Sequence, residues 1–216
     1  MFEQFLSWQQ VGFIVGGVGV TLAYSITSVF FGLIIGIFLA ILKVSSNRSG
    51  RLFANAYTSV FRGTPLLIQL TIIYFGLPTL IGVKLGIFVA GVISFSLNSG
   101  AYISEIIRAG INSIDKGQFE AARALGIAPS LIMRDIILPQ AARVILPSLI
   151  NELINMIKES ALISVVGGYD LMRRAQVVAA ETYNFFAPML IAAATYYILV
   201  MVISILGKLL EKWLKI

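Results

Sequence analysis

Residues Gln118 to Pro139 read QFEAARALGIAPSLIMRDIILP and form the one long polar interruption in an otherwise apolar chain. Strong helix formers fill Gln118 to Leu125, and Gly126 stands where a left-handed residue would end such a helix. Pro129 suits the first turn of a second helix, and Pro139 is expected to limit its other end. The stretch therefore predicts a helix-turn-helix hairpin.

The surface of this hairpin is expected to contact another protein. Ala121 and Ala122 have almost no side chain, so that surface can lie close against a groove on a partner. Four charged residues can pair at its rim, namely Glu120, Arg123, Arg134 and Asp135. The alternative is a solvated helical hairpin that only joins two membrane spans.

The composition predicts a polytopic membrane protein with a single domain, residues 1–216. Hydrophobic residues make up 58% of the 216 and charged residues 12%, with a mean hydropathy of +0.93. The chain has no cysteine and no histidine, which excludes thiol catalysis, disulfides and histidine-based metal sites. Gly207-Lys208 is followed by leucine and lacks the upstream glycine of a P-loop, so the chain is not expected to bind ATP by such a loop.

Five apolar stretches are long enough, or nearly so, to cross about 30 Å of hydrocarbon. They run from about Val15 to Leu42, Tyr57 to Leu80, Leu85 to Ile107, Val144 to Val166 and Phe185 to Leu206. The segment Arg62-Gly63-Thr64-Pro65 cuts into the second, so Leu52 to Phe61 is alternatively an interfacial helix that leads into a shorter span. The start MFEQFLSWQQ has no basic residue before the first apolar run, so the first span is expected to be retained. We therefore expect an all-α fold with five transmembrane helices and the hairpin between the third and fourth.

Basic residues predict the orientation in the membrane, because loops rich in Lys and Arg stay in the cytoplasm. Eleven of the 16 basic residues fall on one side of the predicted spans. These are Lys43, Arg48, Arg51, Arg108, Lys116, Arg123, Arg134, Arg143, Lys208, Lys212 and Lys215. The hairpin and the C-terminus are thus expected in the cytoplasm and the N-terminus outside. The formal charge of +6 reflects this bias, and nucleic-acid binding is not expected.

Polar residues at membrane depth are costly and are candidates for a solute path. The predicted substrate-binding residues are Asn98, Ser99 and Tyr102 of the third span and Glu152, Asn155 and Glu159 of the fourth. Two carboxylates against one cation, Lys158, favour a cationic solute, and a zwitterion also suits. The alternative is structural: Lys158 neutralises a carboxylate, and Asn98 bonds across helices.

The hairpin residues fit the pattern EAA-x3-G-x9-I-x-LP, formed by Glu120-Ala121-Ala122, Gly126, Ile136 and Leu138-Pro139. This pattern resembles the loop by which membrane subunits of bacterial ATP-binding-cassette (ABC) importers hold their ATPases. Four further segments are similar to permeases of polar amino acid importers, including glutamine, histidine and arginine systems. They are RGTPLLIQ from Arg62, YISEIIR from Tyr102, Asn151-Glu152 and KESAL from Lys158.

The resemblance implies a permease that works in the bacterial plasma (inner) membrane by alternating access. Its implied partners are two ATPase subunits, a second identical or related permease and an external solute-binding protein. ATP and Mg would be bound by the partner ATPase, and no cofactor by this chain. The residues implied in ATPase coupling are Glu120, Ala121, Ala122, Arg123, Gly126, Leu138 and Pro139. The carboxylates favour a basic amino acid, while Lys158 leaves glutamine open.

Two other functions fit a polytopic membrane protein with intramembrane carboxylates. An ion- or proton-coupled secondary amino acid carrier predicts uptake that collapses with a protonophore and needs no partner ATPase. A passive channel or a structural scaffold predicts no solute-stimulated ATP hydrolysis in a reconstituted complex. Neither accounts for the spacing of the EAA pattern.

Overall fold

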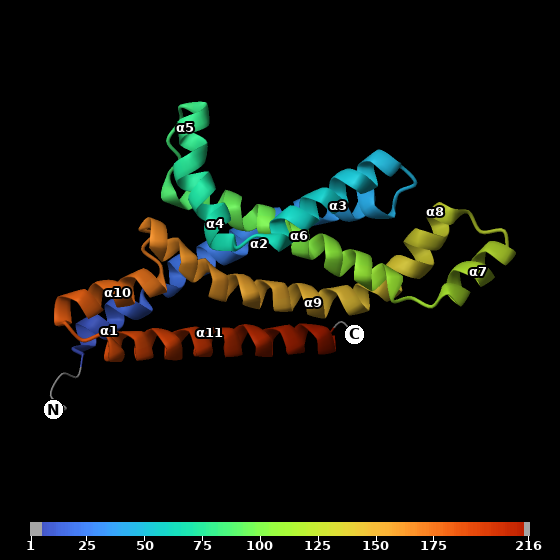
Figure 1. Cartoon of the computed structure of the whole chain (residues 1–216). Coiled ribbons are helices and arrows are strands. Elements are labelled where there is room, and N and C mark those ends of the chain that lie inside the picture. Colours follow the sequence, from blue (N-terminus) through green and yellow to red (C-terminus); the bar gives the residue numbers. More distant parts are fainter. Residues whose placement is uncertain (1–5, 214–216) are drawn as a thin grey trace.

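The computed structural model describes residues 6–213, which form an elongated bundle of helices with no strand in that range (Figure 1). The first five residues and Lys215 lie outside the described range. Four helical segments within it are long and apolar enough to cross a membrane, and the number is five if a pair of helices bent by 101° is counted as one span. The predicted all-α membrane fold is therefore confirmed.

The first span consists of α1 (Trp8–Val15) and α2 (Val18–Val44), which follow one another with a short break at Gly16-Gly17. It begins earlier than predicted because Ser7 caps α1: its hydroxyl accepts a hydrogen bond from Gln10 N at 3.3 Å, and the Gln10 side chain accepts one from Ser7 N at 2.9 Å. The helix therefore starts at Trp8.

The second predicted span is broken at Thr64-Pro65. Helix α3 (Arg48–Gly63) and the segment Leu66–Ile81 meet at an angle of 101°. The Gln69 amide stabilises the corner by donating to Phe61 O at 2.9 Å and to Thr64 O at 3.0 Å. The interpretation of residues 52–61 as a separate helix before a shorter span is thus supported.

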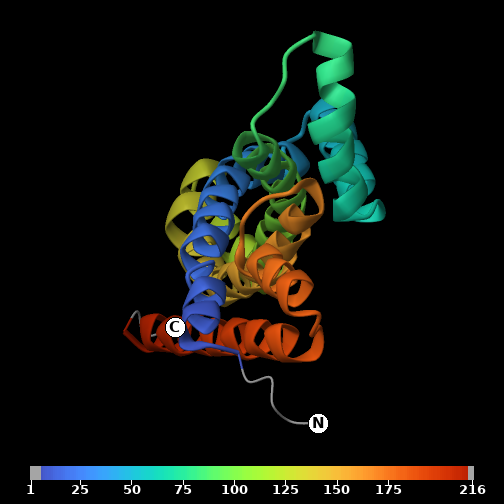
Figure 2. The ribbon, with the colours of Figure 1, turned by 90° about the vertical axis from the view of Figure 1, so that its left-hand side faces the viewer.

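The segment after the corner packs into the core at its start, where Leu70 is fully buried, and its end stands away from the other helices as an arm in both views (Figures 1 and 2). It contains α4 (Leu66–Thr71), a π-helical turn at Ile72–Gly76 and α5 (Leu77–Ile81). Gly82 then takes a left-handed conformation, with φ 72°, and ends the arm.

Helix α6 (Ile87–Asn112) is the third span and packs closely along α2. A Cβ atom at Gly32 would lie 2.9 Å from Ser99 Cβ, and one at Gly36 would lie 2.5 Å from Ile103 Cγ2. Gly32 and Gly36, four residues apart on one face of α2, thus let the two helices approach closely.

The polar stretch forms the expected hairpin at one end of the molecule (Figure 1). Helix α7 (Lys116–Ala124) ends in a Schellman motif, in which Gly126 N donates to Arg123 O at 2.9 Å and Ile127 N to Ala122 O at 3.1 Å. Gly126 is left-handed with φ 73°, and α8 (Pro129–Leu131) begins at a proline. The predicted turn at Gly126 is confirmed.

The expectation that Pro139 ends the second helix is wrong. The chain continues from α8 through a π-helical turn (Ile132–Ile137) into α9 (Leu138–Glu159). A proline in a regular helix collides with the carbonyl four residues earlier, and the wider π turn, where Leu138 N bonds to Met133 O, relieves that collision. The hairpin is therefore continuous with the fourth span.

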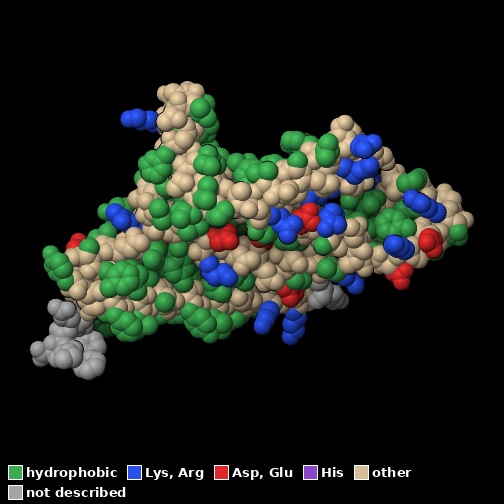
Figure 3. All heavy atoms as spheres, viewed as in Figure 1, with side chains coloured by type: hydrophobic (Ala, Val, Ile, Leu, Met, Phe, Trp, Pro, Cys, Tyr) green, Lys and Arg blue, Asp and Glu red, His purple; other side chains and the backbone are tan. Residues whose placement is uncertain are grey.

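After α9 the chain forms a 3₁₀ segment (Ser160–Val166), α10 (Leu171–Thr182) and the last span, α11 (Phe186–Trp213). Helix α11 runs along α9 (Figure 1), where a Cβ at Gly207 would lie 2.6 Å from Ile150 Cγ2. Hydrophobic side chains cover much of the face seen in Figure 3, as expected for a surface in lipid.

Candidate functional site

Glu152 and Ser99 meet in the interior between α9 and α6. The Ser99 hydroxyl donates to Glu152 Oε1 at 2.8 Å, and both residues are buried. Gly32 of α2 packs directly on Ser99, so the close approach of α2 fixes the hydroxyl in place. Within residues 6–213, Glu152 forms no ion pair, so no cation of the described chain compensates this carboxylate when it is ionised.

Asn98 is next to Ser99 in sequence but bonds to the corner between α3 and α4. Its amide nitrogen donates to Phe61 O and to Gln69 Oε1, both at 3.0 Å, and the side chain is 4% exposed. These contacts match the structural alternative for Asn98. Its two N–H donors are occupied within the chain, which leaves no donor for the carboxylate of a solute.

Asn155 and Glu159 lie at the end of α9, away from Ser99. Together with Lys158, Ala161 and Leu162 they line a cavity of about 370 Å³. Asn155, Lys158 and Glu159 are exposed, and Lys158 pairs with no carboxylate in the described part of the chain. The six predicted substrate-binding residues therefore do not form one site. Ser99 and Glu152 bond each other, Asn155 and Glu159 line this cavity, Asn98 bonds to the corner at Phe61 and Gln69, and Tyr102 has a partly exposed ring.

A cluster of charges around Glu105 joins three helices, and its members are not among the site residues predicted from the sequence. Glu105 Oε1 accepts from Lys43 of α2, and Oε2 accepts from Arg108 Nε at 3.0 Å and Nη2 at 2.7 Å. Arg62 of α3 completes it, with Nη1 3.9 Å from Oε2. Lys43 also donates to Thr58 Oγ1 at 3.0 Å.

Lys43 and Arg62 belong to different predicted segments from Glu105, so only the tertiary packing of α2 and α3 on α6 brings them together. The sequence signal was weak: a carboxylate one turn after Tyr102, with cations nearby only in space.

The hairpin presents most of its predicted coupling residues on its surface. Glu120, Ala121, Arg123, Gly126, Leu138 and Pro139 are exposed. Ala122 is 3% exposed and packs with Ile111, Ile132 and Ile137, so the expectation that its methyl group faces a partner is corrected. The hairpin thus has its own small apolar core, and Ala121 is the alanine that faces outward.

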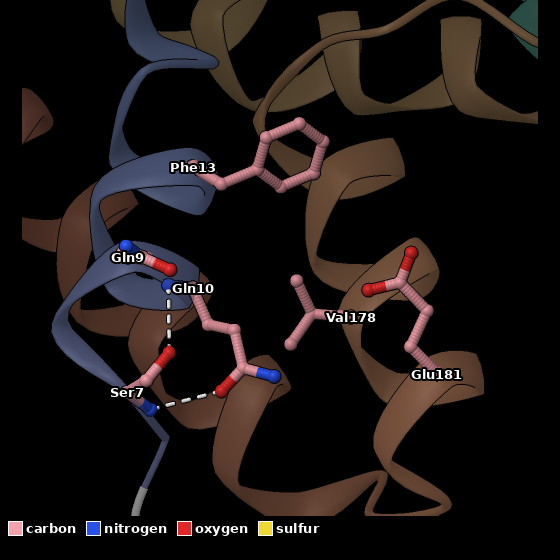
Figure 4. A pocket seen from close by; sticks show the side chains of 6 residues that line it. All are labelled: Ser7, Gln9, Gln10, Phe13, Val178 and Glu181. Atoms are coloured by element: carbon pink, nitrogen blue, oxygen red, sulfur yellow. Dashed lines mark hydrogen bonds between the residues drawn. The ribbon is translucent and has the colours of Figure 1, made fainter.

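The opposite end of the molecule holds a polar cavity of about 300 Å³ between α1 and α10 (Figure 4). Ser7, Gln9, Gln10, Phe13, Val178 and Glu181 line it. Nearby, Arg174 joins the same two elements, because Nη1 donates to Phe13 O at 3.0 Å and the guanidinium lies 5.1 Å from the Phe13 ring centroid.

Asp170 caps α10 from a fully buried position between the fourth and fifth spans. Its Oδ1 accepts from Arg173 N at 2.8 Å, and its Oδ2 accepts from the Tyr196 hydroxyl at 3.2 Å. Burial raises the pKa of Asp170 to about 6, while the hydrogen bonds from Arg173 N and Tyr196 act in the opposite direction. No group of three His, Cys, Asp or Glu side chains that could hold a metal ion occurs among residues 6–213.

Comparison with known proteins gives matches along nearly the whole chain. Residues 32–216 match the profile of the family described as "Binding-protein-dependent transport system inner membrane component". A "Putative glutamine transport system permease protein GlnP" of Rickettsia felis is 65% identical over 213 residues, 98% of each chain. An "Arginine transport system permease protein ArtQ" of Bacillus subtilis is 51% identical over 206 residues, 95% of this chain and 94% of the relative.

A solved structure also matches nearly the whole chain. It is described as "Crystal structure of an amino acid ABC transporter with histidines" and is 41% identical, with a TM-score of 0.91. The match covers 97% of this chain and 99% of that chain. The arrangement of helices described above is therefore the arrangement of a solved transporter chain.

Proposed function

The chain belongs to the family of binding-protein-dependent transport system inner membrane components, and we propose that it forms the translocation path of an ATP-driven importer for a basic amino acid. The relatives described above are named as a putative glutamine and an arginine transport system permease protein, and the solved neighbour is described as an amino acid ABC transporter. In this proposal the permease carries out no chemical step. ATP and Mg are bound by separate ATPase subunits.

The preference for a basic amino acid is supported by Glu152. Its carboxylate is buried in the bundle; within residues 6–213 it accepts a hydrogen bond from the Ser99 hydroxyl and forms no ion pair. An isolated buried carboxylate is unfavourable unless a cation pairs with it. The side-chain ammonium or guanidinium group of a basic solute supplies such a cation in addition to the α-ammonium group, whereas glutamine offers its α-ammonium group alone.

The coupling proposal concerns the hairpin. Its exposed surface at Ala121 and Gly126 contacts an ATPase subunit, and the Schellman turn and small apolar core keep the hairpin rigid. Because the hairpin continues through the π turn at Ile132–Ile137 into α9, a displacement of the hairpin moves the helix that carries Glu152. A pair of permeases driven by two ATPases would alternate between inward-open and outward-open states, since ATP binds one state better than the other.

The topology proposed for this assembly has the N-terminus outside and the hairpin and C-terminus in the cytoplasm, as the basic residues predict. The cavity between α1 and α10 then faces an external solute-binding protein. The ATPases meet the hairpin at the other end.

Uptake by a reconstituted complex tests the substrate proposal. The permease is combined in proteoliposomes with its ATPase and binding protein, and uptake of labelled arginine, lysine, histidine and glutamine is compared. We expect ATP-dependent uptake of a basic amino acid, and we expect Glu152→Gln to reduce it more than it reduces thermal stability. Preference for glutamine, with Glu152→Gln unchanged, would refute the basic preference.

The same vesicles distinguish this importer from a secondary carrier. ATP-driven import should persist when a protonophore collapses the proton gradient, and it should cease when the ATPase is left out. Uptake that follows the proton gradient without ATP would contradict the proposal.

A further inference from the structure

Arg62 holds a guanidinium group beside α6 that makes no hydrogen bond to any residue in the range 6–213. Its Nη1 is 3.9 Å from Glu105 Oε2, and its Cζ lies 5.3 Å from the centroid of the Tyr102 ring. The Arg62 side chain is 44% exposed. Arginine carries five N–H donors in a fixed fork that fits a carboxylate, so these donors are available to an anion.

Glu105 cannot satisfy Arg62, because other cations already occupy both of its oxygens. Lys43 donates to Oε1, and Arg108 donates twice to Oε2. Three cations therefore share one carboxylate, and the site is left with a positive excess. A second anion placed on Arg62 would lower the repulsion among the three cations.

The position of Arg62 relates it to the solute path. Tyr102, on which the guanidinium stacks, follows Ser99 by three residues, so the two lie on one face of α6 and about 5 Å apart along its axis. Ser99 in turn bonds Glu152. Ser99, which bonds Glu152, and Tyr102, over which Arg62 lies, are thus about one helical turn apart along α6.

The carboxylate of a zwitterionic solute needs donors, and Asn98 was the nearest candidate by sequence. The structure commits both N–H groups of Asn98 to Phe61 O and Gln69 Oε1. Arg62 lies immediately after Phe61 at the end of α3, and its donors are not committed. It is therefore the better-placed receptor on this side of the bundle.

We propose that Arg62, oriented by Tyr102 and Glu105, binds the carboxylate of the transported amino acid on the cytoplasmic side of Glu152. This inference rests on the proposed function. An anionic lipid headgroup offers the same chemistry as a carboxylate, so the experiment has to separate the two sources.

The test measures binding of a labelled basic amino acid to the purified permease–ATPase complex, without the binding protein, whose own carboxylate recognition would obscure the result. The complex is held in nanodiscs of phosphatidylcholine alone. We expect Arg62→Gln to weaken binding about 10- to 100-fold, the loss of one hydrogen-bonded charge pair. Arg62→Lys, which keeps the charge but not the fork, should give an intermediate affinity.

Arg108→Gln is the matched control, because Arg108 has a similarly exposed side chain but donates to Glu105 instead. It should change affinity much less than Arg62→Gln. The amino acid amide, which lacks the carboxylate, should compete weakly with the wild-type complex and should lose no further affinity for Arg62→Gln.

The outcomes that would overturn this inference are distinct. Unchanged affinity in Arg62→Gln, an equal loss in Arg108→Gln, or an equal loss for the amide would each refute a carboxylate contact. If Arg62→Gln lowers the affinity for the amino acid only in nanodiscs that contain anionic phospholipid, Arg62 binds a lipid headgroup and not the solute carboxylate. A wild-type complex that neither binds nor transports any amino acid would overturn the proposed function as well.

Discussion

Replacing Gly36 by alanine tests the close contact on which the interior site depends. A Cβ at this position would lie 2.5 Å from Ile103 Cγ2, 2.7 Å from Ile103 Cβ and 3.1 Å from Gly100 O. None of these atoms is the end of a flexible side chain, so α2 and α6 must separate. Gly32 lies one turn away and packs on Ser99, so the separation is also expected to loosen the Ser99–Glu152 hydrogen bond.

The magnitude follows from two opposing effects. Overpacking a well-packed contact costs about 1–3 kcal/mol, while replacing a helical glycine by alanine gains up to about 1 kcal/mol. Gly19 of the same helix isolates the second effect, because nothing lies within 4 Å of a Cβ placed there. Gly36→Ala should therefore be less stable than Gly19→Ala by about 1–3 kcal/mol.

The assay is thermal stability in detergent, measured as the temperature at which half of the protein still elutes as a single species. For a chain of this size the difference corresponds to roughly 2–4 °C per kcal/mol. Ile103→Ala is itself destabilising because Ile103 is buried, but Gly36→Ala should cost less in the Ile103→Ala background than in the wild type. Equal melting temperatures for Gly36→Ala and Gly19→Ala would refute the close packing of α2 on α6.

Three further perturbations address other parts of the chain. Glu105→Gln leaves Lys43, whose side chain is 1% exposed, without its carboxylate, so stability should fall by about 3–5 kcal/mol, and an unchanged melting temperature would contradict the cluster. Gly126→Val should leave the protein in the membrane but abolish ATP-dependent uptake, because φ is 73° at this position and a residue with a side chain adopts that conformation only at a cost of about 1–2 kcal/mol. Normal uptake by this variant would count against a role of the turn in coupling. The pKa of Asp170 is raised to about 6 from an ordinary 3.8, so the contribution of its protonated form to stability is complete below pH 3.8 and is lost as the pH rises through 6. The melting temperature of Asp170→Asn should therefore rise relative to that of the wild type between pH 4 and pH 7, and a difference that stays constant over this range would refute the shift.

The sequence predicted the parts of the fold that depend on local patterns. Apolar length located the spans, and the glycine-proline punctuation located the hairpin turn at Gly126 and the corner at Thr64-Pro65. Pro139 was misinterpreted because a π turn can absorb a proline without ending a helix. Whether the chain forms a π turn before Pro139 depends on how α8 and α9 are aligned, and no local sequence pattern specifies that alignment.

The candidate site was less predictable because its contacts join residues that are distant in sequence. Ser99 and Glu152 were both selected for their depth in the membrane, yet their hydrogen bond depends on the packing of α6 against α9. Asn98 was selected by the same reasoning, but the corner at Gln69 occupies its donors. Arg62 and Glu105 became relevant only when α3 was placed beside α6.

The central claim is that the hairpin contacts the ATPase in the cytoplasm, and a single cysteine at Ala121 tests it most directly. The chain has no native cysteine, so a photoreactive maleimide attaches at that position alone. In vesicles of known orientation, Ala121→Cys should react only from the cytoplasmic side and should cross-link to the ATPase subunit. Lys84 lies between the second and third predicted spans and is therefore expected outside, so Lys84→Cys should do neither. Reaction of Ala121→Cys with a membrane-impermeant reagent from outside, or a complex in which it never cross-links to the ATPase, would contradict the account.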